Sequence, residues 1–195
     1  MERLVRKYEQ RFRRVKEEMS TWDALHGRLV KQYSNAAAIL DRLPVLVAVE
    51  NYGVLGNELS MARDLPAAQV ESLELLFRAM TNTLSDLSRV VAALEKVWRD
   101  GCQLLKAERQ QPTASQMQQR VGPRPSLQDC VNGLHTLYQM HFDEYNLKVA
   151  IVSSLTYGSR GEDVSALQSL LVDQPNIPST EVRYIFDLID GGEGK

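Results

Sequence analysis

A proline-free heptad repeat over residues 70–105 constrains the fold more than any other feature of the sequence. Apolar residues recur there at alternating steps of three and four, which is the spacing of a coiled-coil seam. One core position holds Phe77, Leu84, Val91, Trp98 and Leu105, and the other holds Leu73, Met80, Leu87, Leu94 and Gly101. All of these residues except Gly101 are apolar, so this helix needs a partner helix.

The first forty residues repeat the same period. Their seam consists of Val5, Tyr8, Phe12, Val15, Met19, Trp22, His26, Leu29, Tyr33, Ala36, Leu40 and Leu43. We expect a first helix from about residue 2 to about residue 42, ended by Pro44, because the residue before a proline is disfavoured in a helix. The two helices have similar lengths, which suggests antiparallel packing within one chain. A parallel homodimer is the alternative that the sequence leaves open.

Three further helices are expected after residue 125. Ser126 with Asp129 resembles a capping box, in which each side chain binds a free backbone N–H of the other residue. A long helix then runs from Leu127 to about Thr156, followed by short helices over residues 163–172 and 178–189. The apolar face of the long helix is predicted to hold Leu127, Val131, Leu134, Tyr138, Phe142, Tyr145, Val149 and Val152.

The predicted fold class is therefore all-α. It comprises a long antiparallel coiled-coil-like hairpin, a third long helix and two short C-terminal helices in an elongated bundle. A connector over residues 45–66, with Gly53 and Gly56, joins the two hairpin helices. We place the hairpin at residues 1–109, a flexible linker rich in Gln and Pro at 110–125, and a C-terminal helical module at 126–195.

Composition narrows the class of protein. The formal net charge is -2, which argues against coating nucleic acid with the whole surface. Cys102 and Cys130 have no paired spacing, as expected in a reducing compartment. The longest apolar run, Leu43 to Val49, is too short to span a bilayer, and the charged N-terminus is no secretory signal. We expect a soluble intracellular protein that makes no membrane contact.

Residues suited to catalysis are few. His141 and Glu144 have the spacing of a metal-ligand pair, but the seams of the first two helices offer no further glutamates to complete such a site. His26 lies on the first seam, where a hydrogen-bonded, half-buried role is favoured over a ligand role. Neither cysteine has the neighbours that a nucleophile requires. We expect no enzyme, no catalytic residue, no metal and no cofactor.

The first sixteen residues are strongly basic. Seven Lys and Arg residues stand there against Glu2 and Glu9, and they alternate with the seam residues, so they form the outer face of the first helix. This face is suited to nucleic acid, an acidic protein or an import receptor, or it is simply a solvated surface. Arg11, Arg13 and Arg14 are the partner-binding candidates here.

The order of several short segments resembles the CINP family, the cyclin-dependent-kinase-interacting proteins. In chain order these segments are Trp22-Asp23-Ala24-Leu25, Leu29, Ala36-Ala37-Ala38-Ile39-Leu40, Glu74-Leu75-Leu76, Thr83-Leu84-Ser85-Asp86-Leu87, Leu94-Glu95-Lys96, Leu137-Tyr138-Gln139-Met140, Glu144-Tyr145-Asn146-Leu147-Lys148, Ser154-Leu155 and Gln174-Pro175. The chain departs from the family in its linker at residues 110–125, which resembles no segment of that family.

The resemblance implies a non-enzymatic adaptor of a nuclear multiprotein complex, with the cytoplasm as a second location. Such an adaptor is tied to the cell cycle and the replication checkpoint, and works with an AAA ATPase complex in ribosome maturation and replisome handling. The implied partners are AAA ATPase subunits, a second small helical adaptor and a cyclin-dependent kinase. Implied partner-binding candidates are Trp22, Tyr145, Leu147, Lys148, Gln174 and Pro175.

Two other functions remain open on the sequence alone. One is a structural coiled-coil subunit of a kinetochore or tethering complex, which the two seams would also suit. The other is a nucleic-acid-binding protein that uses its basic first helix, with nucleic acid bound either directly or through the complex.

Overall fold

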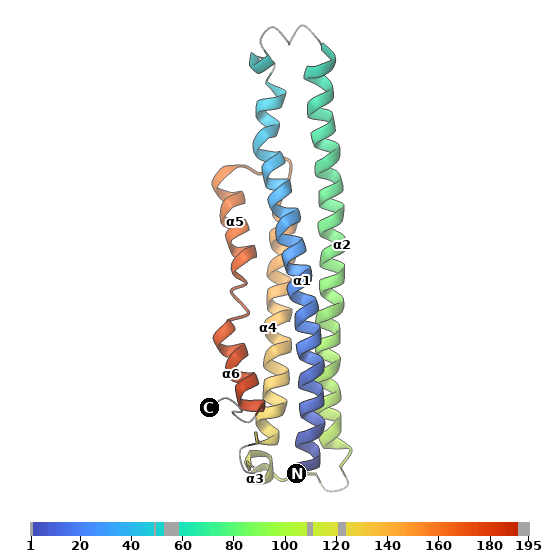
Figure 1. Cartoon of the computed structure of the whole chain (residues 1–195), viewed down its shortest axis with the longest axis vertical. Helices are drawn as coiled ribbons and strands as arrows, with labels where there is room; N and C mark the ends of the chain where they lie inside the picture. Colours follow the sequence, from blue (N-terminus) through green and yellow to red (C-terminus); the bar gives the residue numbers. More distant parts are fainter. Residues whose placement is uncertain (1, 49, 53–58, 109–110, 121–123, 191–195) are drawn as a thin grey trace. The chain divides into compact units, whose positions relative to one another are not determined.

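The computed structural model describes residues 2–48, 50–52, 59–108, 111–120 and 124–190. These residues form α-helices and no β-strand, so the all-α prediction is confirmed. The helices are α1 (Glu2–Val47), α2 (Leu59–Lys106), α3 (Ala114–Gln118), α4 (Leu127–Ser154), α5 (Gly161–Asp173) and α6 (Ser179–Ile189), drawn in Figure 1. Gly53 and Gly56 of the predicted connector lie outside the described residues.

The chain divides into two compact units. Unit 1 consists of Met1–Ala24, Leu87–Asn146 and Gln174–Lys195, and unit 2 consists of Leu25–Asp86 and Leu147–Asp173. Each unit therefore combines a segment of α1, a segment of α2 and a segment of α4. The partition into a hairpin, a linker and a C-terminal module stays a prediction.

The α1 and α2 segments are antiparallel neighbours within each unit (Figure 1). In unit 2, Arg28 lies 3.9 Å from the carboxylate of Asp86, and Thr83 donates a hydrogen bond of 3.0 Å to Gln32. Higher numbers in α1 thus meet lower numbers in α2. The predicted hairpin within one chain is confirmed.

Gly101 marks a point in unit 1 where three helices approach closely. A Cβ atom at this position would lie 3.0 Å from Leu134 of α4 and 3.2 Å from the Tyr8 ring of α1. The Tyr8 hydroxyl donates a 2.7 Å hydrogen bond to the Gly101 carbonyl oxygen. Because Gly101 has no side chain, α1 and α4 can both approach α2 closely at this position.

The two predicted seams are largely buried. Among the α1 and α2 seam residues, the structure buries Val5, Tyr8, Phe12, Val15, Trp22, Leu29, Tyr33, Ala36, Leu40, Leu73, Met80, Leu84, Leu87, Val91 and Leu94. Burying one such side chain contributes about 1.5–3 kcal/mol, so both seams contribute substantially to stability. Phe77, Trp98 and Leu105 are only half-buried.

The buried face of α4 differs from the predicted one. Along α4 and just after it, one buried row consists of Leu127, Cys130, Leu134, Leu137, His141, Glu144, Lys148, Ile151 and Leu155, and Met140 is also buried. These nine positions form a strict heptad seam, but its fifth to seventh members, His141, Glu144 and Lys148, are polar or charged, so hydrophobicity alone does not reveal it. The predicted face was wrong beyond Leu134, because Tyr138 and Tyr145 are half-buried and Phe142 is exposed.

Pro44 does not end α1. The helix continues to Val47, with Pro44 inside it, whereas the sequence predicts an end near residue 42. A proline in a helix leaves the carbonyl four residues earlier without its N–H donor. Here Arg160 supplies the donor, because its guanidinium binds the Leu40 carbonyl oxygen at 3.1 Å. Likewise, α2 begins at Leu59 and includes Pro66.

The beginnings of α3 and α4 are capped. The predicted box at α4 is confirmed: Asp129 N–H donates to Ser126 Oγ at 3.0 Å, and Ser126 N–H donates to Asp129 Oδ2 at 3.1 Å. The short α3 lies inside the stretch predicted as a linker, so that helix was missed. Its signal was Thr113, whose hydroxyl caps the helix in a box with Gln116.

Candidate binding surfaces

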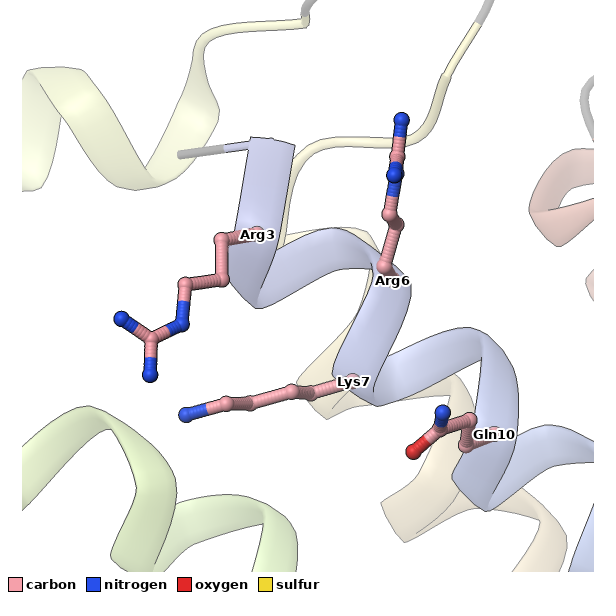
Figure 2. A pocket seen from close by; sticks show the side chains of 4 residues that line it. All are labelled: Arg3, Arg6, Lys7 and Gln10. Carbon is pink, nitrogen blue, oxygen red and sulfur yellow. The ribbon is translucent and has the colours of Figure 1, made fainter.

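The N-terminal turns of α1 carry a basic concavity, which we define by its lining residues Arg3, Arg6, Lys7 and Gln10. Its volume is about 440 Å³. Steps of three and four keep the four residues on neighbouring positions of α1, because an α-helix turns once in 3.6 residues, although their side chains spread apart. Figure 2 shows Arg3 and Lys7 extending to the same side of α1, whereas Arg6 points away from them.

The basic residues that follow the concavity are tied more closely to the fold. Arg11 is half-buried and donates to the Lys7 carbonyl oxygen at 3.0 Å. Arg14 is exposed and lies 4.0 Å from Glu18, one helical turn away. Arg13 is exposed. The sequence prediction thus found the right segment, but it named Arg11, Arg13 and Arg14 rather than the set that lines the concavity.

Lys16 connects α1 to α6 within unit 1. Its ammonium lies 2.9 Å from Asp190 Oδ2 and 4.8 Å from the centre of the Phe186 ring. The same phenyl ring meets Phe12 of α1 edge-on, with ring centres 6.1 Å apart. These contacts give Lys16 a structural role.

Trp22 and Gln174, both partner-binding candidates, bind each other inside unit 1. The indole N–H of Trp22 donates a 2.8 Å hydrogen bond to Gln174 Oε1, and the Trp22 side chain is 1% exposed. The Trp22 ring also meets the His141 ring edge-on, with centres 5.0 Å apart. Partner binding through these residues stays a prediction, and the buried indole has a structural role in this fold.

His141 and Glu144 also serve the interior of unit 1. The Leu137 carbonyl lies 2.7 Å from His141 Nδ1, so this nitrogen carries the proton and donates it. Glu144 Oε2 accepts the backbone N–H and the side-chain amide of Asn176, both at 3.2 Å. The Glu144 carboxylate on α4 thereby binds the turn that precedes α6. In the described residues, no group of three His, Cys, Asp or Glu side chains is placed to hold a metal ion.

Lys148 is a fully buried cation of unit 2. Its ammonium lies 3.1 Å from His26 Nδ1 and donates to the Leu171 carbonyl oxygen at 3.4 Å, and its side chain is 0% exposed. An ammonium can only donate, so His26 Nδ1 accepts and the His26 proton resides on Nε2. Burial, and then the charge of Lys148, lower the pKa of His26 from 6.5 to about 4. This pair has a structural role in unit 2.

The remaining candidates lie nearer the surface. Tyr145 and Leu147 are half-buried, and Pro175 is exposed. Pro175 also lines a cleft of about 380 Å³ between α4 and the turn before α6, together with Gln139 and Asp143. Of the candidates drawn from the resemblance, Pro175 is therefore the best exposed.

An aromatic patch, consisting of Trp98, His135, Tyr138 and Phe142, lies on the surface of unit 1. The Trp98 and Tyr138 rings are stacked within 7° of parallel with centres 5.6 Å apart, and His135 lies 4.7 Å from Trp98. Phe142 continues the patch beyond Tyr138, at 5.9 Å, and is 38% exposed. Sequence reasoning assigned Trp98, Tyr138 and Phe142 to helix cores, which concealed this surface.

None of the described helices combines the length and the apolarity that a membrane crossing requires. Cys130 is buried, which raises the pKa of its thiol to about 12, and Cys102 is half-buried. A thiol with so high a pKa is a poor nucleophile. The described residues form an all-α protein that presents, among other surfaces, a basic concavity and an aromatic patch.

The family follows from a direct comparison. The family model described as "Ribosome biogenesis protein C1orf109-like" (CA109-like) matches residues 2–192. The chain belongs to this family of ribosome biogenesis proteins. No curated protein matches the chain. The match supports the ribosome-maturation part of the sequence prediction. It does not confirm the CINP family, so that resemblance stays a prediction, as do the implied ties to a cyclin-dependent kinase, DNA replication, an AAA ATPase complex and the nucleus.

Proposed function

We propose that this chain is a non-enzymatic helical adaptor in ribosome maturation. The observation that carries the proposal is the family match, which spans residues 2–192 and therefore every helix from α1 to α6. Polar side chains in the interior of the chain bind one another, as His26 and Lys148 do, which suits a structural role for them. The exposed surfaces of the chain are then left to bind other proteins.

The resemblance to the CINP family supports a finer version of this proposal. In that version the adaptor works in the nucleus with AAA ATPase subunits and a second small helical adaptor. Ties to DNA replication and the cell cycle, through a cyclin-dependent kinase, belong to the same version. The segments that carry the resemblance include Leu137-Tyr138-Gln139-Met140, and Tyr138 stands at the centre of the aromatic patch.

We assign the aromatic patch to the contact with a protein subunit of the maturation assembly. Trp and Tyr dominate the binding energy of protein interfaces, because their large rigid rings lose little conformational freedom on binding. The stack of Trp98 on Tyr138 fixes both rings before any partner arrives. Phe142 adds apolar area at the end of the patch.

Affinity purification of the tagged chain from native extract, followed by sedimentation, tests the proposal. We expect ribosome-maturation factors to be recovered, and the chain to co-sediment with pre-ribosomal particles. The double variant Tyr138→Ser with Phe142→Ser removes the outer part of the patch and should reduce this recovery at least about tenfold, since interface hot spots contribute about 2 kcal/mol or more each.

The matched control is Tyr184→Ser, which removes an aromatic ring that is 65% exposed on α6, in the same unit but outside the patch. We expect it to recover partners like the unmodified chain. Recovery of the chain alone, without any ribosome-maturation factor, would contradict the adaptor function. Equal recovery by the double variant and the control would contradict the assignment of the patch.

A further inference from the structure

The basic concavity at the start of α1 is lined by three cations and one amide. Arg3, Arg6 and Gln10 are exposed, and Lys7 is half-buried. Lys7 lies 4.0 Å from Glu108, a long, partly exposed ion pair that contributes little to stability. Such a surface attracts an anionic ligand.

We propose that the basic concavity binds the phosphate backbone of RNA through Arg3, Arg6 and Lys7. The Arg guanidinium offers a planar fork of donors that matches two oxygens of one phosphate, and Lys adds a point charge. Gln10 supplies an uncharged amide donor beside them. The proposal concerns sequence-independent contacts, because phosphates carry no base information.

The directions of the side chains favour a polyanion over a single ion. Arg3 and Lys7 extend to one side of α1, and Arg6 points away from both (Figure 2). The three groups are therefore spread around the helix rather than turned toward one point, which suits several phosphates better than one. Successive phosphates of one strand can meet them in turn, because they repeat along the backbone.

The surroundings favour nucleic acid over an acidic protein. The large apolar residues of this segment, Leu4, Val5, Tyr8 and Phe12, are all buried. The exposed large hydrophobic residues of the described chain lie elsewhere, and the first of them is Val45. A protein partner would need apolar anchors, whereas nucleic-acid interfaces are polar and positively charged.

Two neighbouring cations of α1 contribute to the fold of unit 1. Arg11 binds a backbone carbonyl, and Lys16 binds Asp190 and covers Phe186, so both stabilise unit 1. The choice of RNA over DNA rests on the proposed function in ribosome maturation. The charge and geometry of the concavity stand apart from that function.

Fluorescence anisotropy with the purified chain and a single-stranded RNA of about 20 nucleotides tests the proposal. We expect binding whose affinity falls with salt, with a slope of log K against log salt of about -2, because three phosphate contacts contribute about 0.7 each. The triple variant Arg3→Gln, Arg6→Gln, Lys7→Gln should bind at least about tenfold more weakly and lose most of this slope.

The matched control is Lys96→Gln, Arg99→Gln, Arg183→Gln, which removes three exposed cations of the same unit away from the concavity. We expect it to bind RNA within about twofold of the unmodified chain. An equal loss in both triple variants would overturn the proposal, because overall charge would then explain binding. Thermal melts of both variants should match the unmodified chain, and Arg3→Lys with Arg6→Lys should retain most of the affinity.

Two further probes separate the ligand classes. A DNA strand of the same sequence should bind no more tightly than the RNA, and a polyglutamate peptide of equal charge should bind more weakly than either. Tighter binding of the peptide would replace RNA with an acidic protein, and tighter binding of DNA would remove the assignment to RNA. Either result overturns the proposal as stated.

The outcomes also separate this proposal from the adaptor function. The triple variant of the concavity should still recover protein partners in the affinity purification, since the aromatic patch is untouched. Loss of RNA binding with intact partner recovery supports both proposals. If the unmodified chain binds RNA but recovers no maturation factor in the affinity purification, the adaptor function is contradicted and the RNA proposal is not.

Discussion

Gln174 adopts an unusual backbone conformation. Its φ is 47°, in the left-handed region, and it is the non-glycine residue with positive φ in the described chain. This conformation costs an L-residue about 1–2 kcal/mol, because Cβ approaches a carbonyl oxygen. The Gln174 carbonyl accepts Ile177 N–H at 2.9 Å, and its side chain accepts the Trp22 indole N–H. The side-chain hydrogen bond thus offsets the backbone strain.

We predict that Gln174→Gly is more stable than Gln174→Ala by about 1 kcal/mol. Both variants lose the hydrogen bond to Trp22, so both should be less stable than the unmodified chain. Only glycine also removes the clash of Cβ in the left-handed region. The free energies of unfolding, measured by urea denaturation of the three proteins, test this order.

Gln103 provides the control, because it is exposed in the ordinary helical backbone of α2. There the order should invert, with the Gly variant less stable than the Ala variant by about 1 kcal/mol. If the Ala and Gly variants show the same order of unfolding free energies at Gln174 as at Gln103, the left-handed conformation of Gln174 has no effect on stability.

At the scale of the helix, Pro44 and Arg160 act as a pair. The Leu40 carbonyl oxygen accepts from Arg160 because Pro44 has no N–H to offer it. We predict that Arg160→Ala destabilises the chain by about 1–2 kcal/mol, as expected for a partly buried hydrogen bond from a charged donor. In a chain that carries Pro44→Ala, the new backbone N–H reaches Leu40, so the same Arg160→Ala substitution should cost markedly less.

A double-mutant cycle of these substitutions, followed by urea denaturation, gives the coupling free energy. We expect it to favour the pair by about 1 kcal/mol. Arg42→Ala is the control in both backgrounds, because Arg42 binds the Ala38 carbonyl within its own helix, at 2.9 Å. A coupling near zero for Arg160 would mean that this guanidinium does not replace the missing N–H.

The helices differ in how well the sequence predicted them. The seams of α1 and α2 consist almost entirely of large apolar residues, so their period was readable and the hairpin followed. The seam of α4 has the same period, but His141, Glu144 and Lys148 occupy three successive positions in it. Their burial depends on partners that lie far away in the sequence, such as Asn176 and His26. No local pattern predicts such partners.

The candidate surfaces show the same limit. The excess of positive charge predicted the basic segment, but the roles of individual cations depend on tertiary contacts, as Lys16 with Asp190 shows. The aromatic patch requires α4 to be turned so that Tyr138 faces outward, towards Trp98. From the sequence alone, an apolar residue at a heptad position is assigned to the core. Its exposure becomes clear only once the rotation of its helix and of the neighbouring helix is known.

For the molecule as a whole, one buried and one half-buried histidine, His141 and His26, link folding to pH. Burial lowers the pKa of His141, an effect partly opposed by its hydrogen bond to Leu137 and by the charge of Glu144. The pKa of His26 falls from 6.5 to about 4, first by burial and then by Lys148. Because the unfolded chain binds these protons more readily, the contribution of His26 to stability is fully present above pH 6.5 and is lost as the pH drops towards 4, and that of His141 has the same sign.

We therefore predict that urea midpoints decrease steadily between pH 7 and pH 4. His26 should contribute about 1–2 kcal/mol of this loss, a value discounted because its ring is half-buried and partly screened by solvent. His26→Gln keeps an acceptor for Lys148 but cannot be protonated, so its midpoints should fall less over the same range. Burial raises the pKa of Asp23, which acts in the opposite direction, but equally in both proteins. Parallel pH profiles for the two proteins would show that protonation of His26 is not coupled to folding.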